Sequence, residues 1–267
     1  MTTDLRALAA DTLRILETGR YRAPRGGTVD IAGPLRTAID STRLYEPADQ
    51  LPAGQPADHR DGGPVVSVTG ESTLAGARRL GRDGDVAALV FASAKHPGGG
   101  FRNGAKAQEE DVARASGLYR CLNAVPQYYA AHKSRSDNLY SDRVIYSRGV
   151  PVFRDDDGSL LDEPFLVSLL TAAAPNRGAV PRDRAAQVAQ VLTKRARRVV
   201  AVATALGHRR LVLGAWGCGV FRNDPATVAE AFAVALAEQA AYLDEVVFAI
   251  MDKPGSATRA AFDERFR

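Results

Sequence analysis

The chain has 267 residues, of which 45% are hydrophobic, so it can bury a sizeable core and is neither disordered nor fibrous. It carries 35 basic and 31 acidic residues, and because only five of the basic residues are lysine, 30 are arginine. A GC-rich genome is the simpler explanation of this excess. The alternative is a surface that attracts nucleic acid or another polyanion.

The two cysteines, Cys121 and Cys218, lie far apart, with no CxxC pair and no neighbouring histidine cluster. We therefore expect neither a structural zinc nor a disulfide framework. No apolar run approaches the roughly 18 residues of a membrane helix, and Asp4 and Arg6 interrupt the N-terminal leucines where a signal peptide would be apolar. These features predict a cytoplasmic protein.

Hydrophobic spacing predicts an amphipathic helix over residues 3–18 and a second short helix over residues 34–44. Residues 46–64 contain four prolines and three glycines among polar residues. Such a composition is typical of a surface loop, and we expect a domain boundary there.

From residue 64 onward, short apolar runs alternate with helical patterns, and Asp224 followed by Pro225 forms a helix start signal. This alternation predicts an α/β fold with a largely parallel sheet. The expected strands cover residues 65–69, 86–92, 165–173, 210–215 and 246–251. The expected helices cover residues 74–80, 107–125, 182–206 and 224–243, with a last helix capped by Ser256.

A glycine-rich loop, residues 93–100, follows the strand expected at 86–92. In open α/β sheets ligands bind at the carboxyl ends of strands, and three consecutive glycines let backbone amides approach a phosphate or sugar closely. Gly98, Gly100 and Gly104 are spaced one residue too long for the dinucleotide fingerprint, and no P-loop is present. An NAD dehydrogenase or an NTPase is therefore not expected.

Gln108, Glu109 and Glu110 open the helix after this loop. Acidic residues are common in a first helical turn because they favour the positive end of the helix dipole. Beside a glycine loop, however, one carboxyl group could position a substrate while the other moves a proton. Successive helical residues point about 100° apart, so the two carboxyl groups cannot have equivalent roles.

A second glycine-rich loop, residues 213–221, follows the strand expected at 210–215. It is either a tight strand-to-helix connection, with Trp216 and Phe221 filling the core, or a backbone nest for a diphosphate with Phe221 stacked on a base or sugar. Two such loops, each after a strand, favour a nucleotide-like ligand.

Taken together, these segments resemble poly(ADP-ribose) glycohydrolases. The glycines at 98–100, followed after seven residues by Gln-Glu-Glu at 108–110, are similar to the signature of that family, and residues 217–221 resemble its diphosphate loop. Residues 91–95 and 116–119 resemble the shorter bacterial type.

The resemblance spans most of residues 64–252. It implies a three-layer α/β/α macrodomain-like fold with a mixed central sheet. Residues 61–267 would form the catalytic domain, and residues 1–60 would form an N-terminal helical extension and loop.

By the same resemblance, Glu110 is the catalytic acid/base, Glu109 holds the ribose hydroxyls and Gln108 supports the loop. Ser93 and His96 stand where family members often carry asparagine, which leaves sugar positioning open. By weaker analogy with macrodomains, Thr69, Gly70 and Glu71 contact the base. The substrate-binding set so implied is Ser93, Gly98, Gly99, Gly100, Gln108, Gly217, Cys218, Gly219, Val220, Phe221, Thr69 and Glu71.

The implied reaction is hydrolysis of the ribose–ribose glycosidic bonds of poly(ADP-ribose), with Glu110 as general acid and then general base. Poly(ADP-ribose) or ADP-ribosylated proteins would be the substrate and ADP-ribose the product. We expect a monomer that needs no cofactor or metal and contacts neither membranes nor specific nucleic acid sequences.

Two alternatives remain at this stage. The chain could bind ADP-ribose without cleaving it or remove single ADP-ribose units from proteins, although the Gln-Glu-Glu triplet speaks against both. It could also be a basic nucleic-acid-binding module, but its one dense basic run, residues 194–198, falls on an expected helix and is interpreted as a solvated face.

Overall fold

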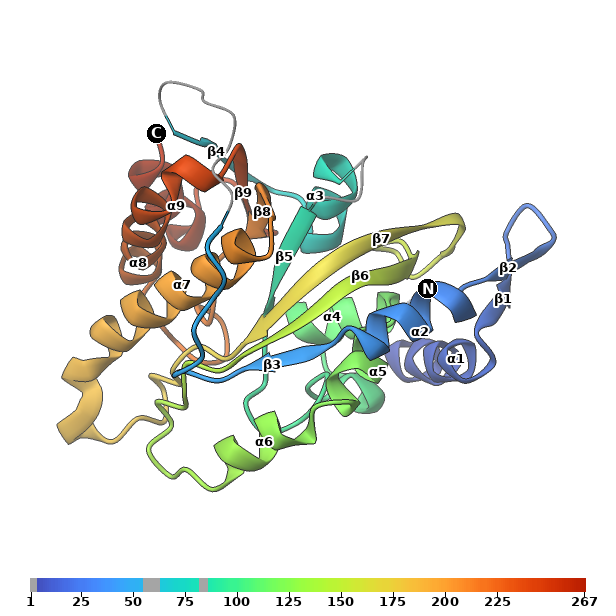
Figure 1. The fold of residues 1–267 in the computed structure, drawn as a ribbon, viewed down its shortest axis with the longest axis horizontal. Coiled ribbons are helices and arrows are strands. Elements are labelled where there is room, and N and C mark those ends of the chain that lie inside the picture. The colour runs from blue at the N-terminus through green and yellow to red at the C-terminus, as the bar shows by residue number, and fades with distance from the viewer. Residues whose placement is uncertain (1–3, 55–62, 82–85) are drawn as a thin grey trace.

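The computed structural model describes residues 4–54, 63–81 and 86–267, and its centre is a seven-stranded sheet with helices on both faces (Figure 1). A separate two-stranded hairpin extends from one end of the molecule. The strands are β1 (Arg20–Arg22), β2 (Thr28–Asp30), β3 (Arg43–Tyr45), β4 (Val65–Thr69), β5 (Val86–Phe91), β6 (Val144–Arg154), β7 (Leu160–Ala172), β8 (Arg210–Leu213) and β9 (Glu245–Ala249). The helices are α1 (Leu5–Thr18), α2 (Ala32–Asp40), α3 (Thr73–Leu80), α4 (Gln108–Ala115), α5 (Leu118–Asn123), α6 (Pro126–Lys133), α7 (Val188–Ala205), α8 (Pro225–Glu238) and α9 (Ala257–Arg265).

The large sheet has the strand order β3-β6-β7-β5-β8-β9-β4. Strands β7, β5, β8, β9 and β4 run parallel to one another, whereas β6 pairs antiparallel with both β7 and the edge strand β3. The α/β class and the mixed central sheet are thereby confirmed. All five expected strands are present, as β4, β5, β7, β8 and β9. The alternating pattern did not predict the other two strands of this sheet, β3 and β6.

Strand β5 lies in the middle of the sheet and shows why the fold has three layers. Successive side chains of a strand point to opposite faces. Leu89 packs into the core beneath α7, α8 and α9, while its neighbours Ala88 and Val90 pack into the core beneath α1 to α6. A strand that is buried on both faces must be apolar throughout, as this one is.

The prediction of one helix over residues 107–125 is wrong, because this segment forms two helices, α4 and α5. Ser116 between them adopts an extended conformation and forms a single bridge with Val152 of β6. At Gly117 an added Cβ would lie 2.8 Å from Leu35 Cδ1, so the break lets the backbone pack closely against α2. The periodicity of the apolar residues continues through the break and does not reveal it.

Three other boundaries also differ from the expectation. The helix expected to reach residue 44 ends at Asp40, since Leu44 belongs to the edge strand β3. The helix expected from residue 182 begins as a 3₁₀ turn, Arg182–Gln187, and that expected to reach residue 243 ends at Glu238. The caps Asp224 and Ser256 are confirmed, because each side chain accepts a backbone N–H of its helix.

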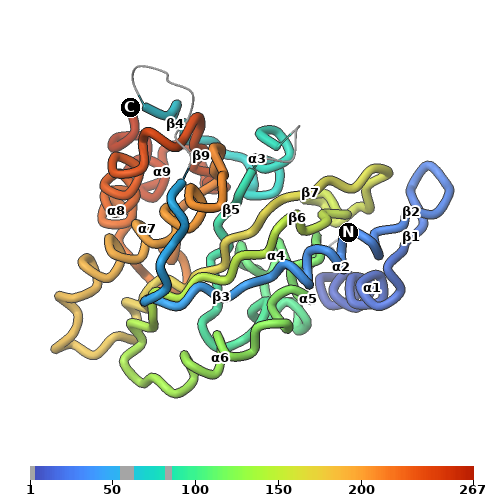
Figure 2. The backbone as a smooth tube through the Cα atoms, viewed as in Figure 1, coloured from blue at the N-terminus to red at the C-terminus, as the bar shows by residue number. Residues whose placement is uncertain are grey.

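The N-terminal segment is joined to the main sheet (Figure 2). Strand β3 pairs with β6, and Thr12 of α1 donates a hydrogen bond to the Arg114 carbonyl oxygen at 2.6 Å. The domain boundary predicted near residue 60 lies outside the described residues, and the division itself stays a prediction. No helix in the described part of the chain is long and apolar enough to cross a membrane.

Candidate active site

The two glycine-rich loops meet at the carboxyl edge of the sheet. Strands β5 and β8 are parallel neighbours, so the loops that leave them, residues 92–107 and 214–224, lie side by side. Between them is a cavity of about 620 Å³. Its walls are Phe91, Ala92, Ser93, His96, Gly99, Gly100, Asn103, Ala107, Gln108, Glu109, Glu110, Ala174, Trp216, Gly217, Gly219, Val220 and Phe221.

The first loop needs its glycines for both conformation and space. Gly98 and Gly99 have φ values of +68° and +58°, in the left-handed region that side chains disfavour. A Cβ at Gly99 would lie 2.2 Å from Glu110 Oε1. The backbone therefore approaches the carboxyl groups of α4 as closely as glycine alone permits.

Gln108 ties this loop to the sheet. Its side-chain oxygen accepts the Phe91 N–H at 2.8 Å, and its nitrogen donates to Thr73 Oγ1 at 3.0 Å and to the Leu89 carbonyl oxygen at 2.8 Å. With these partners Gln108 fixes the start of α4 against β5 and α3.

Glu109 is buried, with 2% of its surface exposed. Its two oxygens accept the Ser93 N–H at 2.6 Å and the Gly98 N–H at 3.1 Å. Burial and, to a smaller extent, the neighbouring Glu110 raise the pKa of Glu109 well above its usual value. Both oxygens of Glu109 thus serve to hold the first loop in shape.

Glu110 faces the same cavity in a different environment. It is half-buried, and its Oε1 accepts one backbone N–H, that of Gly100, at 2.9 Å. Its Oε2 has no hydrogen-bond partner among the described residues. Glu110 therefore presents a free carboxyl oxygen at the cavity wall.

The second loop is held from behind by Trp216 and Asn223. Trp216 is 1% exposed, and its Nε1 donates to the Ala172 carbonyl oxygen at 3.0 Å. Asn223 Nδ2 donates to the Pro175 carbonyl oxygen at 2.9 Å. At Gly217, whose φ is +73°, a Cβ would lie 2.5 Å from that amide nitrogen. Trp216 is core, as one of the two interpretations predicts.

The front of this loop differs from the first loop. Within the described residues, the amides of Gly217, Gly219, Val220 and Phe221 donate no hydrogen bond. Val220 is 80% exposed, and a Cβ at Gly219 would meet no atom within 4 Å. Successive free N–H groups in a concave loop form an anion site.

The remaining predicted contacts are spread unevenly. Ser93 and His96 lie on the cavity wall, and Ser93 Oγ accepts the His96 N–H at 3.2 Å. Cys218 packs against the core, and burial raises the pKa of its thiol to about 12.

The two residues expected near the base lie elsewhere. Thr69 Oγ1 donates to Glu71 Oε1 at 2.9 Å, and Glu71 pairs with Arg79 at 2.5 Å. Thr69 and Glu71 do not line this cavity, and their contact with a base stays a prediction.

A second cavity of about 700 Å³ adjoins the first. The two share Phe91, Ala107 and Gln108 as walls. Residues of α1 and the turn between β6 and β7 line its far side. The hollow therefore continues from the first cavity past the start of α4 to α1 and this turn.

Sequence reasoning missed Asn103, Asn223 and Tyr140. Asn103 lines the cavity, Asn223 holds the second loop, and Tyr140 packs against Phe221. Asn223 directly precedes the helix cap Asp224, but nothing in that position distinguishes it from an ordinary loop residue.

The basic run at residues 194–198 is a solvated face only in part, because Lys194 and Arg197 are exposed whereas Arg195 is buried. Arg195 is 1% exposed, Lys194 pairs with Asp142 at 2.8 Å, and Arg197 pairs with Glu238 at 2.6 Å. Most of its charge is neutralised within the protein. Among the described residues, no group of three or more His, Cys, Asp or Glu residues is arranged so that it could hold a metal ion.

Comparison with known proteins is consistent with this site. Residues 9–155 match the family "Microbial-type PARG, catalytic domain". The chain is 52% identical to poly(ADP-ribose) glycohydrolase from Thermomonospora curvata, with a TM-score of 0.91 and coverage of 98% of this chain and 99% of that one. The same enzyme bound to the inhibitor ADP-HPD gives 51% identity, a TM-score of 0.88 and the same coverage.

A structure of the Deinococcus radiodurans enzyme in complex with ADP-ribose is 44% identical, with a TM-score of 0.79 and coverage of 89% of this chain and 98% of that one. No curated protein sequence matches. The family match covers more than half of the chain, and the similar structures cover nearly all of it. The chain belongs to the microbial-type poly(ADP-ribose) glycohydrolase family.

Proposed function

We propose that this protein hydrolyses the ribose–ribose O-glycosidic bonds of poly(ADP-ribose) and releases ADP-ribose. The observation that carries the proposal is the arrangement of two loops around one cavity. The free oxygen of Glu110 lines the same cavity as Gly217, Gly219, Val220 and Phe221, whose amides have no acceptor among the described residues. A proton carrier and an anion site so placed suit a sugar that is attached to a diphosphate.

The unpaired amides of Gly219 and Val220 would bind the diphosphate, and Phe221 would pack on the adenosine side. The ribose that bears the scissile bond would lie beside Gly99 and Gly100, close to Glu109 and Glu110. Two relatives whose structures contain ADP-ribose and the inhibitor ADP-HPD support an ADP-ribose-like ligand for this cavity.

The reaction uses Glu110 twice. In its protonated form it donates a proton to the 2′ oxygen of the leaving ribose as the bond from that oxygen to the anomeric carbon breaks. The resulting Glu110 carboxylate then takes a proton from the water that attacks this carbon. The proton is thereby returned to Glu110, and no cofactor is consumed. The nearby diphosphate would stabilise the positive charge that develops on the sugar.

A second carboxyl group cannot share this work as it does in most glycosidases. Those enzymes place two carboxyl groups on opposite sides of the bond, roughly 5 to 10 Å apart. Glu109 and Glu110 are adjacent in one helix, and Glu109 is buried with both oxygens bonded to loop amides. We therefore assign Glu109 to holding the loop and the ribose hydroxyls.

Incubation with poly(ADP-ribose), followed by chromatography of the products, tests the proposal. We expect free ADP-ribose from the wild-type chain and intact polymer from Glu110→Gln. Binding of ADP-ribose without any cleavage would show a binding module instead. Release from singly modified proteins but not from polymer would show a mono-ADP-ribosyl hydrolase. The cytoplasmic location and the monomeric state stay predictions of the sequence.

A further inference from the structure

Tyr140 connects the two glycine-rich loops. It forms a small buried cluster with Ala173 and with Ala92 and Ala94, which lie where the first loop leaves β5. Phe221 at the end of the second loop packs against this cluster, and its ring centroid is 6.0 Å from that of Tyr140. One aromatic ring thus contacts the base of one loop and the end of the other.

The backbone at this point is unusual for an aromatic residue. Tyr140 has a φ of +62°, and Asn138 two residues earlier has a φ of +54°. Such values are uncommon outside glycine and persist when the surroundings hold them. Asp137 does so, because its Oδ1 accepts the Leu139 N–H at 3.0 Å and the Tyr140 N–H at 3.3 Å.

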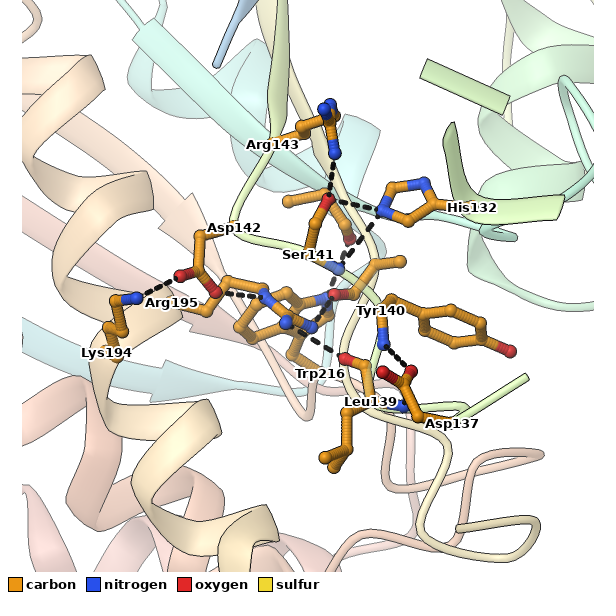
Figure 3. A network of polar contacts seen from close by, with 12 residues as sticks. His132, Asp137, Leu139, Tyr140, Ser141, Asp142, Arg143, Lys194, Arg195 and Trp216 are labelled. Carbon is orange, nitrogen blue, oxygen red and sulfur yellow. Dashed lines mark hydrogen bonds and ion pairs between the residues drawn. The ribbon is translucent and has the colours of Figure 1, made fainter. Parts of the chain in front are cut away.

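Arg195 of α7 supports this segment from the core side (Figure 3). Its Nη2 donates to the Leu139 carbonyl oxygen at 2.9 Å and its Nη1 to that of Ala173 at 2.7 Å. Its Nε pairs with Asp142 at 3.1 Å. A buried charge is costly unless it is paired and hydrogen-bonded, and each of the three guanidinium nitrogens of Arg195 has a partner. It therefore fixes residues 139–142 relative to the end of β7.

His132 supports the other side of the same segment. Its Nε2 is 2.7 Å from Ser141 Oγ and accepts the Ser141 N–H at 3.2 Å. Its ring packs edge-on against that of Tyr140, with centroids 5.7 Å apart. Burial, together with Arg195 and Arg143, lowers the pKa of His132 to about 4, so the ring is neutral at physiological pH.

We propose that Tyr140 is a positioning residue that holds Phe221 and the base of the first loop at the separation that ADP-ribose requires. This inference rests on the proposed function. Tyr140 itself does not line the cavity and is 7% exposed, so it acts through Phe221 and not by contact with the substrate. Its loss should weaken substrate binding and leave the proton transfer of Glu110 unchanged.

The test compares Tyr140→Gly with Tyr140→Phe. Glycine removes the ring and also the conformational strain at φ +62°, whereas phenylalanine keeps the ring in the same backbone. For Tyr140→Gly we expect KM for polymer and Kd for ADP-ribose to rise about two- to tenfold, the factor that corresponds to one aromatic pair. The kcat should stay at the wild-type value, and Tyr140→Phe should restore both constants.

Tyr21→Ala is the matched control, since Tyr21 is also buried and also pairs with one aromatic ring, that of Phe153, but lies in β1. It should lower the melting temperature and leave Kd unchanged. If Tyr140→Gly does not fold, Tyr140→Leu provides the same comparison, because leucine also lacks the ring but fills more of the buried space. A wild-type Kd for ADP-ribose in Tyr140→Gly or Tyr140→Leu would overturn this inference but not the proposed function. So would a Tyr140→Phe variant that binds ADP-ribose as weakly as those two variants. Failure of the wild-type chain to bind ADP-ribose would overturn the proposed function.

Discussion

The two glycine-rich loops are both rich in small residues, but they differ in whether their backbone amides have hydrogen-bond acceptors. In the first loop the amides of Ser93, Gly98 and Gly100 are already bonded to the carboxyl groups of Glu109 and Glu110. In the second loop the amides from Gly219 to Phe221 have no acceptor among the described residues. The first loop binds the anions of the protein itself, and the second is open to an anion from outside.

The comparison shows what each glycine is for. In the first loop a Cβ at Gly99 would lie 2.2 Å from Glu110 Oε1 and collide with the carboxyl group that we propose as the acid/base. In the second loop a Cβ at Gly219 would collide with nothing in the protein. The absence of a side chain there is needed only if a ligand occupies the space. Substitutions in the two loops should therefore have different consequences for catalysis, binding and stability.

The largest effect is expected from Glu110→Gln. The amide keeps the shape of the side chain but cannot deliver the proton, so polymer hydrolysis should fall by about 10² to 10⁴. Binding of ADP-ribose should persist, and initial rates beside calorimetric affinities measure both. Glu230→Gln on the surface of α8, where Glu230 pairs with Arg265 at 2.6 Å, is the control. Near-normal hydrolysis by Glu110→Gln would remove Glu110 from the mechanism.

Gly99→Ala should be next. The new methyl group would displace Glu110, and hydrolysis should fall on the order of 100-fold, as for a misplaced catalytic group. Gly149→Ala is a matched control, because Gly149 has the same φ of +58° but nothing within 4 Å of its Cβ position. Both variants carry the same backbone strain, so an equal loss of activity in both would implicate strain, and wild-type activity in Gly99→Ala would contradict the collision with Glu110.

The stability of the fold should depend on pH through His132, which packs against Tyr140 beneath the second loop. The pKa of His132 is lowered to about 4 in the folded chain, against about 6.5 when unfolded. Between these values the unfolded chain binds more protons, so the free energy of unfolding should fall as pH decreases from about 6.5 to 4, by at most about 3 kcal/mol from this residue.

His132→Gln should flatten that pH dependence, because glutamine can keep a hydrogen bond to Ser141 without titrating. Chemical denaturation at several pH values measures the slope. His208, whose pKa is also lowered to about 4 by burial, should keep its own contribution in this variant. An unchanged slope in His132→Gln would show that His132 does not titrate in this window.

The smallest effect is expected from Gly219→Ala. It should weaken ADP-ribose binding about tenfold, as for the loss of one well-placed hydrogen bond, with no change in melting temperature. Gly33→Ala is the control, since Gly33 also has free space at its Cβ position but lies in α2. Normal affinity in Gly219→Ala would mean that the diphosphate does not lie against this glycine.

The sequence predicts what local pattern determines. The apolar strand β5 and the caps Asp224 and Ser256 depend on neighbouring residues, and each is confirmed. Gln108 makes three hydrogen bonds to β5 and α3, and its role in supporting the loop stays a prediction. For the site, the glycine loops could be found because they follow recognisable strands.

Other features depend on contacts between distant segments. Strand β6 contains Gly149 and Pro151, which argue against a central strand, and they are accommodated beside an irregularity in its pairing with β7. Arg195 looked like a surface charge because its partners Asp142 and Leu139 are more than 50 residues away. Tyr140 has no local signal at all, because its φ and its contact with Phe221 are visible only in the folded chain.

The most direct test of the difference between the loops is titration of the ¹⁵N-labelled protein with ADP-ribose, with the backbone amides followed by NMR. We predict downfield proton shifts for Gly219 and Val220, which gain an acceptor, and smaller changes for Gly98 and Gly100, which already have one. Large shifts at Gly98 and Gly100 with none at Gly219 and Val220 would contradict the assignment of the second loop as the diphosphate site.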